Sequence, residues 1–455
     1  MKVLIQKGQA HGTVNAPPSK SMAHRLLILA GLSGKECRVH GIAESEDILA
    51  TIDCLKALGA EIELEGEVAH LRGIELCAGS KRASGLVKSA AELESEKCAT
   101  DELRLYARES GSTLRFMIPI ALLTGKMVHI GGSKRLLERP QSVYEELFAG
   151  KENIIFEKNE NEIKVCGKLK SGRYELDGDV SSQFVTGLLL ALPLLDGDST
   201  IVLRPPVESR SYIDMTLEAL AMFGAEADWQ DENTLYIKGG QSYEPQAASG
   251  CQGIPEVTVE GDYSNAAFFE ALNCARQPAS TEATELAGRG QPAGVTVGGL
   301  SARSRQADRV YLELFERLRP AAAGATDPID ISDCPDLGPI LFAVAAALGG
   351  GHFTGTRRLK IKESDRAAAM AAELAKFGVQ TEVRENEVIV SAGTGLHAPT
   401  AELDGHNDHR IVMSLAVLCT LTGGVINGAE AVSKSFPDFF DRLESLGIEV
   451  KRLDN

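Results

Sequence analysis

The stretch Ala16-Pro17-Pro18-Ser19-Lys20-Ser21-Met22-Ala23-His24-Arg25 predicts an extended approach to a helix N-terminus. The two prolines cannot extend a helix toward the N-terminus, and they hold the chain extended. A serine of this stretch can cap the first turn, and the apolar run 26–30 continues the helix. Lys20, Ser21 and Arg25 therefore lie where backbone amides and the helix dipole favour an anion. A capped, solvated helix start without a ligand is the alternative for one such turn taken alone.

The same design recurs along the chain, and this recurrence favours a ligand-binding role. Polar or capping residues precede an apolar helical run each time. These runs are too apolar on all sides for a surface helix, so buried helices are predicted. The five further starts lie at residues 110–115, 181–184, 263–266, 335–338 and 407–410.

Each repeat also contains a second, amphipathic helix and strand-like segments. The clearest case is 48–60, which is followed by two strands predicted at 61–64 and 68–71. The repeat is thus strand, helix, strand, helix and a strand pair, six times over. The other amphipathic helices are predicted at 143–148, 212–223, 310–318, 367–377 and 439–446.

Two similar halves follow from the position of a linker-like stretch. Residues 239–253 are rich in Gly, Gln, Ser and Pro, and three repeats lie on either side. We expect an N-terminal lobe at 16–242, a linker at 243–256, and a C-terminal lobe formed by 1–15 with 257–455. The strand predicted at Val3–Gln6 is expected to complete a sheet of the second half. Residues 277–294 are expected to form a surface loop, and 319–330 is too short for a full strand pair in the fourth repeat.

Composition excludes several classes of protein. The formal net charge of −17 makes the chain a poor general binder of nucleic acid or of anionic membranes. The N-terminus lacks a signal-peptide pattern, and no run of 18 apolar residues occurs. The nine cysteines include no Cys-x-x-Cys pair, which favours reduced thiols in a cytoplasmic protein. Walker and dinucleotide-binding patterns are also missing from the sequence.

Cations gather at the predicted helix starts and at the connections between repeats. If the repeats are arranged alike, the helix starts of each half share one face, and two such faces are expected to line a cleft. Each charge-assisted hydrogen bond there contributes about 1.5–3 kcal/mol, so several can hold two multiply charged small molecules. The groups concerned are Lys20, Ser21, Arg25, Ser112, Arg115, Arg139, Ser181, Ser182, Gln183, Asp336, Lys362, Arg366, His409, Arg410 and Lys434.

Eight motifs, in order over nearly the whole chain, resemble the 5-enolpyruvylshikimate-3-phosphate synthases, an enolpyruvyl transferase family. They are Pro-Ser-Lys-Ser (18–21) with Arg25, Ser-Gly-Ser-Thr-Leu-Arg (110–115), Glu-Arg-Pro (138–140), Ser-Ser-Gln-Phe (181–184), Pro-Asp (335–336), Lys-Glu-Ser-Asp-Arg (362–366), Asp-His-Arg (408–410) and Lys-Ser-Phe-Pro-Asp (434–438).

This resemblance implies a two-domain inside-out α/β barrel, with three βαβαββ-like repeats and buried helices in each domain. It implies a transferase of the shikimate pathway, which leads to chorismate and aromatic amino acids. The reaction moves the carboxyvinyl group of phosphoenolpyruvate to the 5-hydroxyl of shikimate 3-phosphate and releases phosphate. No cofactor and no metal are implied, and the expected partners are the two small-molecule substrates, with a monomeric, cytoplasmic enzyme.

The resemblance also assigns roles residue by residue. Asp336 and Glu363 are the proton-transfer candidates, with help from Lys20, although Glu363 beside Lys362 and Arg366 is alternatively a structural ion pair. Shikimate 3-phosphate is expected at Lys20, Ser21, Arg25, Ser181, Ser182, Gln183, Ser209, Tyr212, Asp336 and Lys362. Phosphoenolpyruvate is expected at Lys20, Gly111, Arg139, Gln183, Arg366, Arg410 and Lys434.

Three substitutions depart from the common family pattern. Glu109 stands where many members carry Asn, Phe116 where many carry Pro, and Arg358 where Asn is common. The first two concern the shape of the pocket, and with it the sensitivity to mimics of phosphoenolpyruvate such as glyphosate.

Specific residues bear on the alternative functions. His406 and His409 have a spacing seen in metal pairs but lack a third ligand in the sequence. Cys334 has no base beside it and is interpreted as a core residue. The related transferase acting on UDP-N-acetylglucosamine is disfavoured because Lys20 is followed by Ser21 rather than Asn, and because no Cys precedes Arg139-Pro140 closely. A non-catalytic anion-binding protein would be expected to lack Asp336, Glu363 or a substrate-binding arginine.

Overall fold

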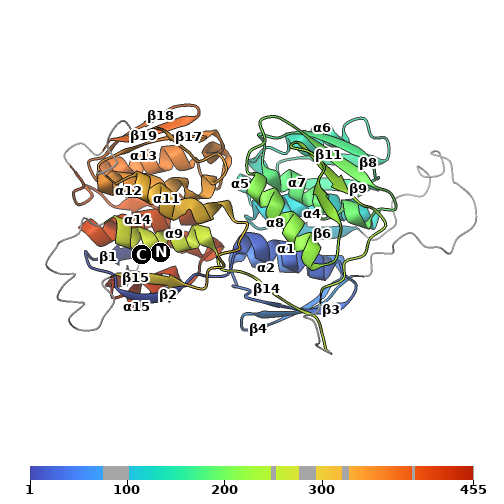
Figure 1. Ribbon diagram of the computed structural model, residues 1–455, viewed down its shortest axis with the longest axis horizontal. Helices are drawn as coiled ribbons and strands as arrows, with labels where there is room; N and C mark the ends of the chain where they lie inside the picture. Colours follow the sequence, from blue (N-terminus) through green and yellow to red (C-terminus); the bar gives the residue numbers. More distant parts are fainter. Residues whose placement is uncertain (75–101, 247–252, 276–293, 320–326, 392–394, 454–455) are drawn as a thin grey trace, which may run out of the picture. The chain divides into compact units, whose positions relative to one another are not determined.

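The structure is a computed structural model that describes residues 1–74, 102–246, 253–275, 294–319, 327–391 and 395–453. The chain divides into two compact units, which are described separately (Figure 1). One is Lys20–Val259, here called the 20–259 unit. The other combines Met1–Ser19 with Glu260–Asn455 and is called the split unit. Each unit encloses its own apolar core.

The 20–259 unit contains three repeats of strand, buried helix, strand, amphipathic helix and strand pair. Its elements are α1 (Lys20–Gly31), β3 (Glu36–His40), α2 (Glu46–Leu58), β4 (Glu61–Glu65), β5 (Val68–Arg72), β6 (Leu103–Tyr106), α4 (Gly111–Thr124), β7 (Val128–Gly131), α5 (Lys134–Glu138), α6 (Ser142–Phe148), β8 (Ile154–Lys158), β9 (Glu162–Gly167), β10 (Arg173–Asp177), α7 (Ser182–Leu189), η1 (Leu192–Leu194), β11 (Ser199–Arg204), α8 (Arg210–Met222), β12 (Ala227–Trp229), β13 (Thr234–Ile237) and β14 (Glu256–Thr258).

The split unit repeats the pattern three more times. Its elements are β1 (Lys2–Ile5), β2 (Gly12–Asn15), α9 (Tyr263–Cys274), β15 (Val295–Gly298), η2 (Ala307–Val310), α11 (Tyr311–Arg317), β16 (Ile329–Asp330), η4 (Pro335–Leu337), α12 (Gly338–Leu348), β17 (Gly351–Thr354), η5 (Arg357–Ile361), α13 (Arg366–Lys376), β18 (Gln380–Val383), β19 (Glu387–Ser391), β20 (Leu403–Asp404), α14 (His409–Thr422), β21 (Gly424–Asn427), η6 (Ala429–Lys434), α15 (Phe439–Ser445) and β22 (Val450–Leu453).

The four-stranded sheets share one topology, which the order β6-β7-β9-β8 illustrates. The first two strands are parallel because α4 connects them, and β9 is antiparallel to both of its neighbours. The orders β14-β3-β5-β4, β10-β11-β13-β12 and β16-β17-β19-β18 repeat this arrangement. In the fourth repeat, β15 pairs with β2. Residues 320–326, part of the short segment predicted there, lie outside the described residues.

The N-terminal strand completes the sixth sheet, as predicted. In the order β20-β21-β1-β22, β1 occupies the third position, which β9 fills in its own sheet. It pairs antiparallel with both β21 and β22, with Val3 opposite Ile426 and Arg452. The two ends of the chain therefore meet in one sheet, and the split unit is closed by residues that precede the 20–259 unit in sequence.

Six helices are buried on nearly all sides, as their apolar composition predicts. They are α1, α4, α7, α9, α12 and α14, and the sheets and amphipathic helices cover them (Figure 1). In the split unit, α9, α12 and α14 pack on one another. The predicted α/β fold with helices inside and sheets outside in each unit is thus confirmed.

The segment around the predicted linker contributes to the 20–259 unit. Tyr243 is fully buried, and its hydroxyl donates to the carbonyl of Leu190 at 2.9 Å. Strand β14 pairs in parallel with β3, with Val257 opposite Val39. Residues 247–252 of this segment are outside the described residues.

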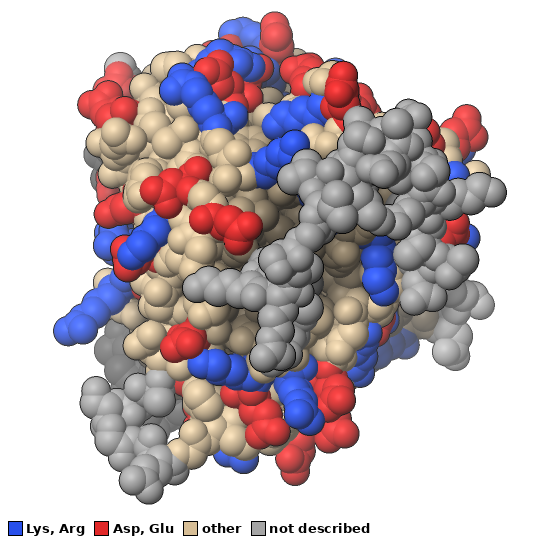
Figure 2. Space-filling model, turned by 90° about the vertical axis from the view of Figure 1, so that its right-hand side faces the viewer, with Lys and Arg blue, Asp and Glu red and all other residues tan. Residues whose placement is uncertain are grey.

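Acidic and basic side chains are interspersed on the face of the molecule shown in Figure 2. Surface charge pairs of this kind contribute little to stability. Within the described residues, no helix is both long and apolar enough to cross a membrane.

Candidate active site

The first turn of α1 brings a lysine against a carboxylate of α2. Lys20 Nζ lies 2.7 Å from Asp47 Oδ2, and the two side chains are only 15% and 11% exposed. Pro18, directly before the turn, bridges to Gly261 and so keeps the approach extended, as the two prolines predict. This ion pair holds the largely buried lysine side chain in place.

Arg25 ties α1 to α7 and α8. Its Nε donates to Thr216 Oγ1 at 2.9 Å, and its terminal nitrogens donate to the carbonyl oxygens of Tyr212 at 2.8 Å and of Ser21 at 2.5 Å. The side chain is buried, and burial lowers the pKa of Arg25 to about 10. It therefore remains a cation near neutral pH. Three of the residues predicted to bind shikimate 3-phosphate are joined by these contacts.

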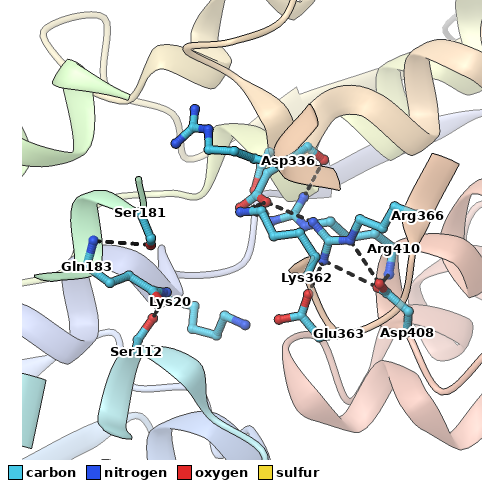
Figure 3. Close-up of polar contacts among 12 residues, drawn as sticks. Lys20, Ser112, Ser181, Gln183, Asp336, Lys362, Glu363, Arg366, Asp408 and Arg410 are labelled. Carbon is cyan, nitrogen blue, oxygen red and sulfur yellow. Dashed lines mark hydrogen bonds and ion pairs between the residues drawn. The ribbon is translucent and has the colours of Figure 1, made fainter. Parts of the chain in front are cut away.

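Gln183 connects the starts of α4 and α7. Its Oε1 accepts from Arg115 at 2.6 Å. Its Nε2 donates to Ser112 Oγ at 2.9 Å, as Figure 3 shows. Ser110 and Ser181 cap the two helices through hydrogen bonds from Thr113 N and Gln183 N. The caps and the glutamine thus fix the relative position of two helix N-termini, where an anion is favoured.

Gly111 and Arg139 are in close approach. A Cβ atom built on Gly111 would lie 2.8 Å from an Nη atom of Arg139 and 3.6 Å from Gln183 Oε1. A side chain at the first position of α4 would therefore displace the guanidinium. Arg139 itself is mostly buried, directly after α5.

Phe116, one of the expected departures from the family pattern, packs against Arg25 and His24. The ring is 1% exposed, and the guanidinium carbon of Arg25 lies 5.6 Å from its centroid. His24 meets the same ring edge-on at 6.3 Å. A cation above an aromatic face is stabilised, so the Phe116 ring stabilises the guanidinium of Arg25.

The split unit gathers cations around Asp336. Its Oδ1 lies 2.9 Å from an Nη atom of Arg366 and 3.2 Å from Lys362 Nζ, while Oδ2 lies 3.1 Å from Arg410 (Figure 3). Arg410 also donates to the main-chain carbonyl of Asp336 at 3.0 Å and to Ser264 Oγ at 3.0 Å. Burial lowers the pKa of Lys362, although Asp336 opposes that shift. Residues from η4, α13, α14 and the segment after η5 thus meet at one carboxylate.

Arg366 is the centre of this cluster and is only 1% exposed. It contacts Glu363 Oε2 at 2.6 Å and Asp408 Oδ2 at 2.8 Å in addition to Asp336. Burial lowers the pKa of Arg366, but Asp408, Glu363 and Asp336 outweigh burial and the net shift is upward. The ion pair predicted as an alternative role for Glu363 is therefore present in the structure.

The remaining predicted residues lie at helix starts or beside them. Lys434 ends η6, is mostly buried and donates to the carbonyl of Asn407 at 2.6 Å. Ser209 precedes α8 in a left-handed conformation with φ 55°, and Tyr212 lies in the first turn of that helix. Ser182 is the first residue of α7.

Sequence reasoning gave no role to Asp47 or Asp408, although both contact predicted cations. Asp408 was visible as a helix cap, and its carboxylate caps α14 through Arg410 N at 3.0 Å. Asp47 offered no signal beyond an acidic residue in the first turn of α2. Both pairings join segments that are distant in sequence.

The structure also places the residues considered for a metal site and for a cysteine nucleophile. His406 pairs with Glu373 at 3.0 Å, while His409 is buried at the start of α14. Across the described ranges, no group of three or more His, Cys, Asp or Glu side chains has the geometry of a metal site. Cys334 is a free, buried thiol whose pKa is raised by burial, in line with its interpretation as a core residue.

Comparison with known proteins gives concordant matches. The family model described as EPSP synthase (3-phosphoshikimate 1-carboxyvinyltransferase) matches residues 5–443. The 3-phosphoshikimate 1-carboxyvinyltransferase of Clostridium novyi (strain NT) is 36% identical over 452 residues, which cover 98% of this chain and 97% of the relative. The protein of the same name from Clostridium kluyveri is 34% identical over 468 residues, or 98% of each chain.

Solved structures show the same fold. An EPSP synthase from Acinetobacter baumannii has a TM-score of 0.70 at 22% identity, covering 99% of this chain and all of that chain. The enolpyruvyl transferase NikO from Streptomyces tendae has a TM-score of 0.69 at 14% identity, with 99% and 98% coverage.

Proposed function

The chain belongs to the EPSP synthase family, and we propose that it transfers the carboxyvinyl group of phosphoenolpyruvate to the 5-hydroxyl of shikimate 3-phosphate. Phosphate is released, and the product enters chorismate and aromatic amino-acid biosynthesis. The observation that carries the proposal is the Asp336 carboxylate, which Lys362, Arg366 and Arg410 surround within 3.2 Å. A carboxylate held among cations suits proton transfer beside anionic reactants.

The substrate assignments come from the family resemblance, and the chemistry of the side chains supports them. Arginines bind carboxylate or phosphate bidentately, while lysines act as point charges. In the 20–259 unit, Lys20, Arg25 and the serines and glutamine at helix starts suit a sugar-like phosphate. In the split unit, Arg366, Arg410 and Lys434 suit the carboxylate and phosphate of phosphoenolpyruvate. Arg366 would exchange one of its carboxylate partners to bind that substrate.

The proton balance of the reaction fits two carboxylates and a lysine. During addition, Asp336 takes the proton of the 5-hydroxyl as its oxygen bonds to C2 of phosphoenolpyruvate. Glu363, with Lys20 assisting, supplies a proton to C3, which becomes a methyl group. During elimination, the methyl group returns a proton to the Glu363 carboxylate, the C2–O bond to phosphate breaks, and phosphate departs with the proton that Asp336 had taken from the 5-hydroxyl. The nearby cations stabilise the negative charge that develops on the phosphate.

The proposed reaction is tested by measuring phosphate release from phosphoenolpyruvate. We expect release only when shikimate 3-phosphate is added. Release with UDP-N-acetylglucosamine but none with shikimate 3-phosphate would contradict the proposal and identify the related transferase instead.

Replacing Gly111 with alanine is expected to raise the KM for phosphoenolpyruvate about tenfold, or about 1.4 kcal/mol of binding. The new methyl group would displace the Arg139 guanidinium, which lies 2.8 Å from the Cβ position. The KM for shikimate 3-phosphate is expected to change little. Steady-state kinetics with each substrate varied in turn checks this.

Gly253→Ala is the matched control, because no described atom lies within 4 Å of its Cβ position. Equal KM values for phosphoenolpyruvate in the Gly111→Ala variant and the unaltered protein would contradict the role of Arg139.

We also propose the remaining properties from the sequence. The lobe at 16–242 mainly binds shikimate 3-phosphate, and the lobe formed by 1–15 with 257–455 supplies cations for phosphoenolpyruvate and the proton-transfer carboxylates. The linker is placed at 243–256. The enzyme is proposed to be monomeric and cytoplasmic, and the cysteine pattern supports the cytoplasmic location.

A further inference from the structure

The turn that leads into α14 has an unfavourable backbone. His406 and Asn407 have φ angles of 49° and 51°, so two successive residues other than glycine adopt the left-handed conformation. Side chains with a Cβ atom disfavour this conformation, and such residues persist only where surrounding contacts hold them. The turn spans Gly405 to Asp408, because Asp408 N donates to the carbonyl of Gly405 at 2.9 Å.

The side chain of Glu373 in α13 contacts this turn. Its carboxylate is 2% exposed and contacts His406 Nε2 at 3.0 Å. It also accepts from Lys376 Nζ at 2.8 Å and from Asp404 N at 2.9 Å. His406 N in turn donates to Asp404 Oδ1 at 2.7 Å. A buried acid thus contacts both the first strained residue and the backbone two residues before it.

The same turn presents groups that belong to the candidate active site. The carbonyl of Asn407 accepts from Lys434 Nζ at 2.6 Å. The next residue, Asp408, contacts Arg366 at 2.8 Å and caps the helix through Arg410 N at 3.0 Å. The backbone conformation of His406 and Asn407 therefore sets where three predicted ligands of phosphoenolpyruvate lie.

We propose that His406 and Glu373 are positioning residues for phosphoenolpyruvate binding, acting by holding the left-handed turn that places Lys434 and Arg410. This inference rests on the proposed function, because it takes those two cations to bind that substrate. Neither His406 nor Glu373 is required to touch a substrate.

The ion pair between His406 and Glu373 makes the stability of this turn depend on pH. The hydrogen bond from His406 to Glu373 raises the pKa of His406, with burial opposing and Asp404 adding to the rise; Lys376 lowers it. A raised pKa in the folded state means that the stabilisation is fully present below the ordinary histidine pKa and weakens as pH rises through the raised value. The ion pair therefore stabilises the turn more strongly at mildly acidic pH than at higher pH.

Three variants of one position separate the ion pair from the backbone strain. His406→Ala removes the pair and keeps the Cβ atom, so we expect the KM for phosphoenolpyruvate to rise about tenfold, with the KM for shikimate 3-phosphate nearly unchanged. His406→Gly also removes the pair but adopts the left-handed conformation readily, so most of the affinity is expected to return. His406→Gln keeps a neutral hydrogen-bond donor that does not titrate. The pH dependence of the KM for phosphoenolpyruvate that the ion pair gives the unaltered protein is therefore expected to be lost in this variant.

Control and independent measurements complete the test. His70→Ala removes a half-exposed histidine 3.5 Å from Glu65 and is expected to change neither KM. Thermal unfolding is expected to show that His406→Ala is less stable than His406→Gly, whatever substrate the protein uses. NMR titration is expected to show a lower pKa for His406 in the Glu373→Gln variant than in the unaltered protein.

The outcomes distinguish this inference from the proposed function. An unaltered protein that does not consume phosphoenolpyruvate with shikimate 3-phosphate contradicts the proposed function. Normal turnover combined with equal KM values for phosphoenolpyruvate in the alanine variant, the glycine variant and the unaltered protein overturns the positioning role alone. A glycine variant that is as impaired as the alanine variant overturns the argument from backbone strain.

Discussion

An Asp336→Asn variant is expected to turn over about 10²–10⁴-fold more slowly than the unaltered protein. Asparagine keeps the shape of the side chain but cannot take the proton of the 5-hydroxyl. It also removes the negative charge that Lys362, Arg366 and Arg410 share within 3.2 Å. The KM for shikimate 3-phosphate is expected to rise as well, because Asp336 is assigned to its binding. Rates of phosphate release under saturating substrates measure the effect.

The control for this experiment is Asp327→Asn, which neutralises an exposed aspartate nearby in sequence. Its rate is expected to equal that of the unaltered protein. Circular dichroism of the Asp336→Asn variant checks that the fold is retained. A folded Asp336→Asn protein with a rate within about threefold of the unaltered enzyme would remove Asp336 from the proton transfers.

A Lys20→Met variant is expected to lose a similar factor, about 10²–10⁴ in turnover. Lys20 is assigned to both substrates and to assistance in protonating C3, and methionine keeps much of its volume without its charge. The ammonium group is held 2.7 Å from Asp47, so it starts from a fixed position rather than from solvent. Single-turnover measurements separate the loss in the chemical step from weaker binding.

The loss of Lys20 also affects stability, and this must be measured beside the rate. Asp47 would lose a partner while only 11% exposed, at a cost of about 1–3 kcal/mol in the free energy of unfolding. Lys35→Met is the matched control, since Lys35 is 53% exposed and pairs with Glu244 at 2.9 Å. Turnover of the folded Lys20→Met protein at the level of this control would contradict the assigned role.

Much of the fold was predictable because its signals are local. The buried helices follow from uninterrupted apolar runs, and their starts follow from capping residues such as Ser110, Ser181 and Asp408. The amphipathic helices were predicted within about two residues of their observed ends. The strand at the N-terminus was assigned to a sheet of the second half, and β1 pairs there with β21 and β22.

The unpredicted features depend on contacts between distant segments. The pairing of Lys20 with Asp47 joins two helices, and the cluster around Arg366 joins three segments spread over more than 70 residues. The left-handed backbone at His406 and Asn407 is accompanied by a contact of His406 with the buried Glu373, which lies in a different helix. Periodicity and spacing carry no information on such pairings. The substrate roles came from the resemblance of eight motifs, not from pattern alone.

The central claim is that the carboxyvinyl group moves to one defined oxygen, and NMR of the product tests it most directly. Phosphoenolpyruvate labelled with ¹³C at C2 is incubated with shikimate 3-phosphate and the protein. The account predicts a labelled enol ether carbon that shows a long-range coupling to the ring proton at C5. Label found only in pyruvate, or coupling to the proton at C4 instead, would contradict it.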